Sequence, residues 1–180
     1  MQSVKKRHAH VALALASLTS LGFSAQAETS EGGIGLHYGM NGHYSRAELL
    51  YETPSMELYR FDGNWGRIEL NGELGAAYWS ASGSRDPSHV WQFNAIPMFR
   101  WWMSERFYVE AGIGATAFTS TSFADKRIGS AFQFGDHLGL GFLVTPNNRL
   151  GLRYSHYSNA GIKRPNPGLD VVQVTYTYQF

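Results

Sequence analysis

The chain has 180 residues, of which 15 are Lys or Arg and 14 are Asp or Glu, and it has no cysteine. The lack of cysteine excludes disulfides and thiolate metal sites, and the near-neutral charge argues against a nucleic-acid partner. With 14% aromatic residues and 20 glycines, the composition suits β-strands with interfacial aromatic side chains better than a helical bundle.

The N-terminus has the three parts of a secretory signal. Basic residues 5–7 precede an apolar stretch at residues 11–23, and Ala-Gln-Ala follows at residues 25–27. This order predicts a signal peptide at residues 1–27 and a secreted domain at residues 28–180. About 153 residues then remain, which suffice for one domain. No later stretch approaches the ~20 apolar residues of a membrane-spanning helix, so any membrane residence has to come from strands.

Beyond this leader, apolar and polar residues alternate in eight segments that are separated by turn-rich stretches. In the first segment, Ile34, Leu36 and Tyr38 alternate with Gly35 and His37. Each apolar face matches the roughly 9–11 residues that a tilted strand needs to cross a bilayer. In chain order, the segments are residues 34–41, 46–51, 67–78, 91–101, 107–116, 132–142, 150–158 and 170–180.

The polar faces of these segments carry balanced charge, contributed by Arg46, Arg67, Arg100, Arg153, Glu48, Glu69, Glu73 and Glu110. In a soluble β-sandwich these charges would face water, whereas in a membrane barrel they would pair inside and the apolar faces would contact lipid. The secretory leader, the segment length and the C-terminus favour the membrane barrel. Phe180, with Tyr176 and Tyr178 on alternate positions, resembles the last strand of bacterial outer-membrane barrels. We therefore expect an all-β fold, an eight-stranded antiparallel transmembrane β-barrel.

The connections between the strands should alternate between the two membrane faces, with both chain ends on the periplasmic side. Periplasmic connections are expected at residues 53–64, 103–106 and 145–148. External connections are expected at residues 42–44, 81–89, 119–129 and 159–169. The strand at residues 150–158 then runs outward, so its last residues lie at the level of the outer-leaflet glycolipid.

Three residues at this outer end have the chemistry of acyl transfer. His156 and Ser158 share the apolar, lipid-facing parity of their strand, and Asp170 shares that of the last strand. A serine becomes nucleophilic when a base takes its proton, and a third group must orient the imidazole. Residues i and i+2 of a strand are about 7 Å apart, which allows a bent hydrogen bond at a strand end. We therefore predict Ser158 as nucleophile and His156 as base.

Two carboxylates compete to orient His156. The connection at residues 159–169 brings Asp170 back beside Ser158 if the pairing is regular. The turn at residues 146–148 folds the preceding strand onto the other side of His156, which places Asp136 nearby with lipid-facing parity. A carboxylate that faces hydrocarbon is costly without a partner, so Asp136 should touch His156, a neighbouring backbone or a lipid group. The sequence leaves both acids open.

Four short motifs carry a resemblance to a known family. They are His-Tyr-Ser-Asn-Ala-Gly-Ile at residues 156–162, Pro-Asn-Pro-Gly at 165–168, Glu-Ala-Gly-Ile-Gly at 110–114 and Phe-Gly-Asp at 134–136. Together they resemble the outer-membrane lipid A 3-O-deacylase (PagL) family. The resemblance covers essentially the whole secreted domain and is most specific from residue 107 onward.

This resemblance implies a barrel that hydrolyses the ester-linked acyl chain at the 3 position of lipid A. The implied partners are lipopolysaccharide and outer-membrane lipids, no metal or cofactor is needed, and the oligomeric state is left open. Asn159 is either an oxyanion donor or a residue that shapes the turn. The site residues are the nucleophile Ser158, the base His156, the acid Asp170 and, as oxyanion or substrate-binding candidates, Asn166, Gly161 and Asn159.

Two other functions remain as alternatives. A non-enzymatic barrel that acts as an adhesin or a surface-protection protein would need long external loops, and the expected loops are short. An acyltransferase would use the same three residues but would pass the acyl chain to another lipid instead of to water.

Overall fold

The computed structural model describes residues 31–180, and the predicted signal peptide lies outside these described residues. None of the described residues forms a helix long and apolar enough to cross a membrane. The elements are β1 (Gly33–Met40), β2 (Tyr44–Glu52), β3 (Met56–Arg60), β4 (Arg67–Ala81), β5 (His89–Trp102), β6 (Phe107–Phe118), β7 (Ser122–Phe123), β8 (Lys126–Arg127), β9 (Phe132–Thr145), β10 (Asn148–Ser158) and β11 (Leu169–Gln179).

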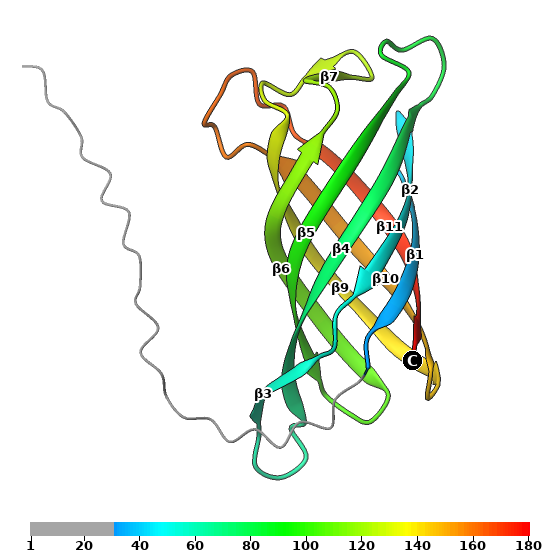
Figure 1. The fold of residues 1–180 in the computed structure, drawn as a ribbon, viewed down its shortest axis with the longest axis vertical. Coiled ribbons are helices and arrows are strands. Elements are labelled where there is room, and N and C mark those ends of the chain that lie inside the picture. Colours follow the sequence, from blue (N-terminus) through cyan, green and yellow to red (C-terminus); the bar gives the residue numbers. More distant parts are fainter. Residues whose placement is uncertain (1–30) are drawn as a thin grey trace, which may run out of the picture.

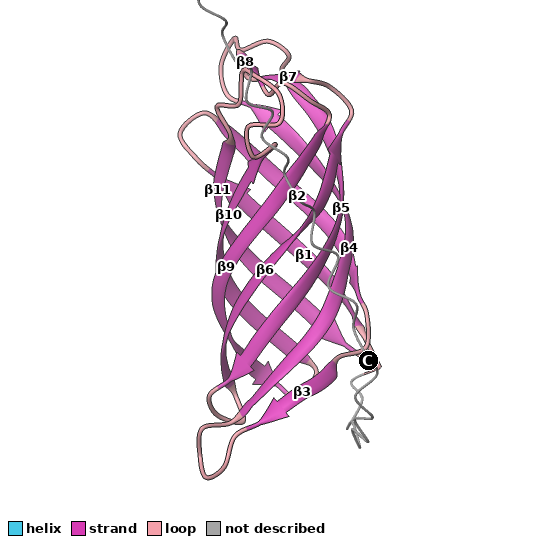
Figure 2. Cartoon of the chain, turned by 90° about the vertical axis from the view of Figure 1, so that its left-hand side faces the viewer, coloured by secondary structure: helices cyan, strands magenta, loops and turns pink. Residues whose placement is uncertain are grey.

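The long strands close into a barrel. They pair antiparallel in the order β2-β1-β11-β10-β9-β6-β5-β4-β3, and β2 also pairs with β4. The first strand meets the last, with Ile34 opposite Tyr178, and this pairing closes the wall. Strands β2 and β3 occupy one position in the wall because both pair with β4. The prediction of an eight-stranded antiparallel barrel is confirmed, and its tilted strands are visible in Figures 1 and 2.

The wall is apolar outside and polar inside, the reverse of a soluble protein. Buried and exposed residues alternate along β1 without interruption. Such an outward apolar surface is stable in hydrocarbon and would aggregate in water, so the predicted direction of the faces is confirmed. Every long strand contributes to this surface, with exposed Leu36, Leu49, Leu74, Phe93, Ile113, Leu140, Leu152 and Val174 among its residues.

Buried ion pairs fill much of the lumen. Arg100 lies 2.8 Å from Glu52 and 3.1 Å from Glu73, and Arg153 binds Glu73 and Glu110, each at 2.7 Å. Because every charge has a partner, the interior can hold them at low dielectric. The other pairs that line the lumen are Arg46 with Glu48, Arg149 with Glu52 and, half-buried, Arg67 with Glu69.

An aromatic cluster closes the lumen toward the end that carries β7 and β8. Tyr157 packs on Trp79 with their ring centroids 5.4 Å apart, and both side chains are buried. Tyr157 stands between His156 and Ser158 in β10. Because side chains alternate along a strand, the burial of Tyr157 in the lumen turns both of its neighbours outward.

Two connections differ from the prediction. Residues 53–64 contain β3, whose Glu57 pairs with Glu69 of β4. The external connection after β6 contains the hairpin formed by β7 and β8. Strand β3 exposes successive residues, and β7 and β8 have two residues each, so neither segment carries the alternating pattern that predicts the other strands. Figure 1 shows β3 at the end of the barrel where the chain terminates and β7 at the opposite end.

Candidate active site

His156 and Asp170 lie directly opposite each other on β10 and β11. The Nδ1 atom of His156 is 2.7 Å from Oδ1 of Asp170. Since an ionised carboxylate only accepts hydrogen bonds, Nδ1–H is the donor and Nε2 is left with a free lone pair. Tyr154 Oη donates to the same carboxylate oxygen over 2.6 Å. Two donors therefore fix the carboxylate that orients the imidazole.

The backbone of Asp170 is also held in place, by residues at the outer ends of β1 and β2. Its N–H donates to Tyr44 Oη at 3.0 Å, and its carbonyl accepts a hydrogen bond from Asn41 Nδ2 at 2.8 Å. Tyr44 belongs to the aromatic cluster in the lumen. The barrel core thus supports the acid through its main chain, while the side chain remains at the outer surface.

Gly168 packs directly against the His156 ring. A Cβ atom at this position would lie 2.6 Å from Cε1 of His156, and the backbone has a φ of +68°. Both facts require glycine, because a side chain would displace the ring and would strain the backbone. Lys126 Nζ donates to the Gly168 carbonyl at 3.2 Å, which ties the loop to β8.

Ser158 is the last residue of β10 and lies opposite Phe134 of β9. It is half-buried and shares the outward face of His156. In the described part of the chain no hydrogen bond joins its Oγ to the imidazole. Such contacts are often loose in the absence of substrate and tighten in the complex, so the geometry remains compatible with a nucleophile and its base.

Asn159 shapes the loop after β10. It is fully buried, its Nδ2 donates to the Ile128 carbonyl at 3.0 Å, and its Oδ1 accepts from the Lys163 N–H at 3.2 Å. Its own N–H donates to Oδ1 of Asn166 at 3.1 Å. Both polar atoms of the Asn159 side chain are therefore engaged in the fold, which favours the turn-shaping role over the role of oxyanion donor.

Asn166 and Gly161, in the loop that follows Ser158, have N–H groups that are free to donate hydrogen bonds. Asn166 uses its oxygen to bind Asn159, and among the described residues no partner is recorded for its Nδ2 group. Gly161 is exposed with a φ of +76°, next to Ala160 with a φ of +51°. Consecutive left-handed residues turn the backbone sharply, and the N–H groups of this turn are the other candidate donors to an oxyanion.

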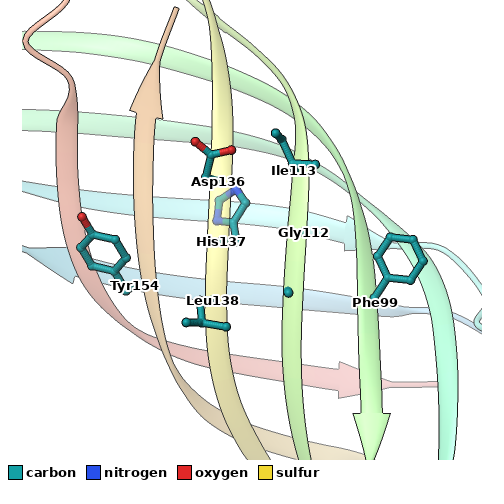
Figure 3. A pocket seen from close by; sticks show the side chains of 8 residues that line it. Phe99, Gly112, Ile113, Asp136, His137, Leu138 and Tyr154 are labelled. Carbon is teal, nitrogen blue, oxygen red and sulfur yellow. The ribbon is translucent and has the colours of Figure 1, made fainter. Parts of the chain in front are cut away.

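Asp136 lies opposite His156 on the other neighbouring strand, β9. Although the register places both acids beside the histidine, no hydrogen bond connects Asp136 with His156 among residues 31–180. Asp136 instead lines a groove of about 430 Å³ on the outer wall, shown in Figure 3. The side chains of Phe99, Ala111, Ile113, Leu138 and Tyr154 line the same groove.

Two other serine–histidine contacts occur in the described residues, and neither has the same surroundings. Ser155 Oγ lies 2.7 Å from His137 Nδ1, but both residues are buried in the lumen. Ser88 Oγ lies 3.2 Å from His89 Nδ1 at the exposed start of β5. No carboxylate contacts either histidine in the described part of the chain. Among the histidines of residues 31–180, only His156 combines a carboxylate partner with a position on the outer wall.

Several supporting residues are not found by the sequence reasoning. Tyr154 and Gly168 both contact the pair formed by His156 and Asp170. Tyr154 shares the outward parity of His156, and this is a signal from which its position beside the site could be predicted. Nothing in the sequence connects Tyr44 or Asn41 with the site. Within residues 31–180 no group of three or more His, Cys, Asp or Glu residues could hold a metal ion.

Comparisons with known proteins agree with this architecture. A family profile described as lipid A 3-O-deacylase (PagL) matches residues 55–179. The lipid A deacylase PagL of Bordetella bronchiseptica is 69% identical over 170 residues, which cover 94% of this chain and 93% of that protein. The lipid A deacylase PagL of Pseudomonas aeruginosa is 30% identical over 169 residues, which cover 90% and 92%.

The fold has a solved counterpart. A crystal structure of the outer membrane enzyme PagL matches with a TM-score of 0.63 and 26% sequence identity, over 81% of this chain and 98% of that one. Profile, relatives and fold agree over most of the described barrel. The chain belongs to the lipid A 3-O-deacylase (PagL) family.

Proposed function

We propose that this protein is an outer-membrane serine esterase that hydrolyses the acyl ester at the 3 position of lipid A. The observation that carries the proposal is the 2.7 Å contact between His156 and Asp170 on the lipid-facing wall, with Ser158 on the same face. Membership of the PagL family supplies the substrate class, because the relatives are named as lipid A deacylases.

In the first half of the reaction, Ser158 attacks the ester carbonyl. Asp170 holds Nδ1–H of His156, so Nε2 takes the proton from Ser158 Oγ as the new C–O bond forms. The tetrahedral intermediate then breaks the bond to the sugar oxygen, which leaves with the proton from His156 Nε2. The acyl chain is now esterified to Ser158, and His156 is again neutral.

In the second half, water replaces the sugar. His156 Nε2 takes a proton from a water molecule, which attacks the acyl-enzyme carbonyl. Collapse of this second intermediate returns the proton to Ser158 and releases the fatty acid. The negative oxygen of each intermediate needs donors, for which we propose Asn166 Nδ2 and the N–H groups near Gly161, with Asn159 as their structural support. One such donor contributes about 3–4 kcal/mol of transition-state stabilisation.

The groove beside the site provides a path for the acyl chain. It begins where His156 of β10 and Asp136 of β9 lie opposite each other in the wall. Its walls are the apolar side chains of β5, β6, β9 and β10. An acyl chain in this groove would remain in contact with hydrocarbon while its ester lies at the level of Ser158. Catalysis on the outer wall therefore requires no entry into the lumen, which buried ion pairs fill.

Replacement of Ser158 with Ala tests this function. Purified lipid A is incubated with refolded protein, and the mass lost from the lipid is followed by mass spectrometry. We expect Ser158→Ala to reduce deacylation at least about 10³-fold, because no nucleophile remains. Ser88→Ala removes an exposed serine that also contacts a histidine, and it should retain activity.

The same spectra separate the alternatives. Hydrolysis yields free fatty acid, whereas acyl transfer would yield a second acylated lipid. Deacylation that persists in Ser158→Ala would refute the proposed nucleophile. A wild-type protein that leaves lipid A intact would favour a non-enzymatic barrel.

A further inference from the structure

Positive charge collects at the outer end of the barrel, where Ser158 lies. The connections at residues 82–88, 119–131 and 159–168 carry five Lys or Arg residues and two Asp or Glu residues. In the described lumen, each arginine pairs with a glutamate. Within residues 31–180 no such ion pair is recorded for four cations of the outer loops, Lys126, Arg127, Lys163 and Arg164.

The two loops that carry these four cations pack against each other. Asn159 Nδ2 donates to the Ile128 carbonyl at 3.0 Å. A Cβ atom on Gly129 would lie 2.5 Å from the carbonyl oxygen of Pro165 and 3.0 Å from that of Lys163, so the two backbones touch. Figure 1 shows β7 at the same end of the barrel as the loop between β10 and β11. The basic residues of the two loops therefore lie on neighbouring segments of the outer rim.

Lys126 is the cation of this group that the fold holds in place. Its Nζ donates to the Gly168 carbonyl at 3.2 Å and lies 5.9 Å from the centroid of the Tyr44 ring. The turn between β7 and β8 is also fixed, because its N–H groups donate to the carbonyls of Asp86 and Pro87 at 2.9 and 3.0 Å. An ammonium group has three N–H donors, and the described residues use one. Two donors are thus left on a half-buried ammonium whose position is set before a ligand arrives.

This ammonium lies beside the proposed site, on the side where the sugar of the substrate is expected. Gly168, whose carbonyl Lys126 binds, also packs against the His156 ring. Lys126 interacts electrostatically with Asp170 as well. Because the acyl chain follows the groove toward the middle of the wall, the sugar lies on the other side of the ester, toward the outer loops. A group on this sugar can therefore reach Lys126 while the ester is at Ser158.

We propose that Lys126 binds the phosphate group of the sugar that carries the scissile ester. This inference rests on the proposed function and adds a specificity-determining residue to it. Lipid A is a phosphorylated glucosamine disaccharide, and its phosphate oxygens can accept hydrogen bonds from the free donors of Lys126. A hydrogen bond in which both partners are charged is stronger than a neutral one. The other three cations, Arg127, Lys163 and Arg164, add attraction for the phosphate over a longer distance.

The test uses lipid A and the same lipid without the phosphate of the ester-bearing sugar. Both are dispersed in neutral detergent micelles with refolded protein, and kcat and KM are measured for each. We expect the wild-type KM to be about tenfold lower for the phosphorylated lipid. The two kcat values should be similar, because the phosphate is bound equally in the ground state and the transition state.

Three variants identify the group that recognises the phosphate. Lys126→Gln can still donate to the Gly168 carbonyl but has no charge, so the ratio of the two KM values should approach one. Lys126→Arg keeps the charge and should keep most of the preference. Arg106→Gln is the control, because it removes an exposed cation from the opposite end of the barrel, and it should show the wild-type ratio.

The opposite results would overturn the inference. They are a wild-type ratio near one, or a Lys126→Gln variant that keeps the ratio while kcat falls for both lipids, which would make Lys126 a support for Gly168 and His156 alone. If Lys126→Gln does not fold, Lys126→Met replaces it, and its ratio must also approach one. Added detergent should leave the preference intact, whereas a preference that disappears on dilution would assign Lys126 to phosphates of neighbouring lipids and contradict the proposal. Failure of the proposed function is separate, because it would appear as turnover of either lipid that survives in Ser158→Ala.

Discussion

Asp170 and Asp136 flank His156 from its two neighbouring strands, but only Asp170 approaches the ring. We expect Asp170→Asn to lower kcat for lipid A about 10³–10⁴-fold, because a neutral amide permits the wrong tautomer of His156. Mass-spectrometric time courses of lipid A deacylation measure this loss. Asp170→Glu keeps the charge and should recover part of the activity.

Asp136→Asn is the matched comparison, because it makes the same chemical change on the opposite strand. In the same time courses, its effect on kcat should be much smaller than that of Asp170→Asn. A loss of kcat in Asp136→Asn as deep as that in Asp170→Asn would make Asp136 the orienting acid.

At the residue scale, the sequence predicts a serine, a histidine and an acid on one outward face, but it cannot choose between the two acids. His156, Ser158, Asp136 and Asp170 all have outward parity, which is a property of the strand pattern alone. Antiparallel pairing places an acid on each side of His156, so register does not distinguish them. The distinction depends on side-chain contacts, namely the hydrogen bonds from Tyr154 and His156 to Asp170.

At the element scale, the loop between β10 and β11 sets the position of the imidazole. Gly168→Ala should lower kcat for lipid A about tenfold or more, because the new methyl group pushes the His156 ring away from Asp170 and Ser158. Steady-state deacylation assays on folded protein measure this effect. Gly63→Ala is the control, because Gly63 has a similar φ of +71° and nothing within 4 Å of an added Cβ. Equal activities of the two variants would contradict the role given to ring displacement.

At this scale, whether a strand can be predicted from the sequence depends on how regular its surroundings are. The long strands are predictable because lipid on one side and a polar lumen on the other impose a strict alternation, as in β1. Strand β3 and the hairpin of β7 and β8 lie at the ends of the barrel, where no such two-sided constraint acts. The length of the loop after β10 is predictable for the same reason as its strands, but the bonds that Asn159 makes inside it are not.

At the scale of the whole molecule, packing in the lumen fixes the position of the outer wall, because the side chains of each strand point alternately inward and outward. The buried Tyr157 ring lies over Arg46, with the guanidinium carbon 5.5 Å from the ring centroid. Arg46 in turn pairs with Glu48 at 2.6 Å. The packed interior therefore holds the strand whose outward residues form the proposed site, and rigid support of this kind keeps catalytic groups in their productive geometry.

The buried charges should make this interior sensitive to the loss of one partner. Arg153 binds both Glu73 and Glu110, so Arg153→Met leaves two buried carboxylates with fewer compensating charges. We expect the free energy of unfolding to fall by about 3–5 kcal/mol, measured by urea titration of tryptophan fluorescence in detergent micelles. Arg60→Met, which breaks the exposed pair with Glu57, should change it by less than about 1 kcal/mol. Similar small changes in both variants would mean that the lumen tolerates unpaired charge, as a hydrated interior would.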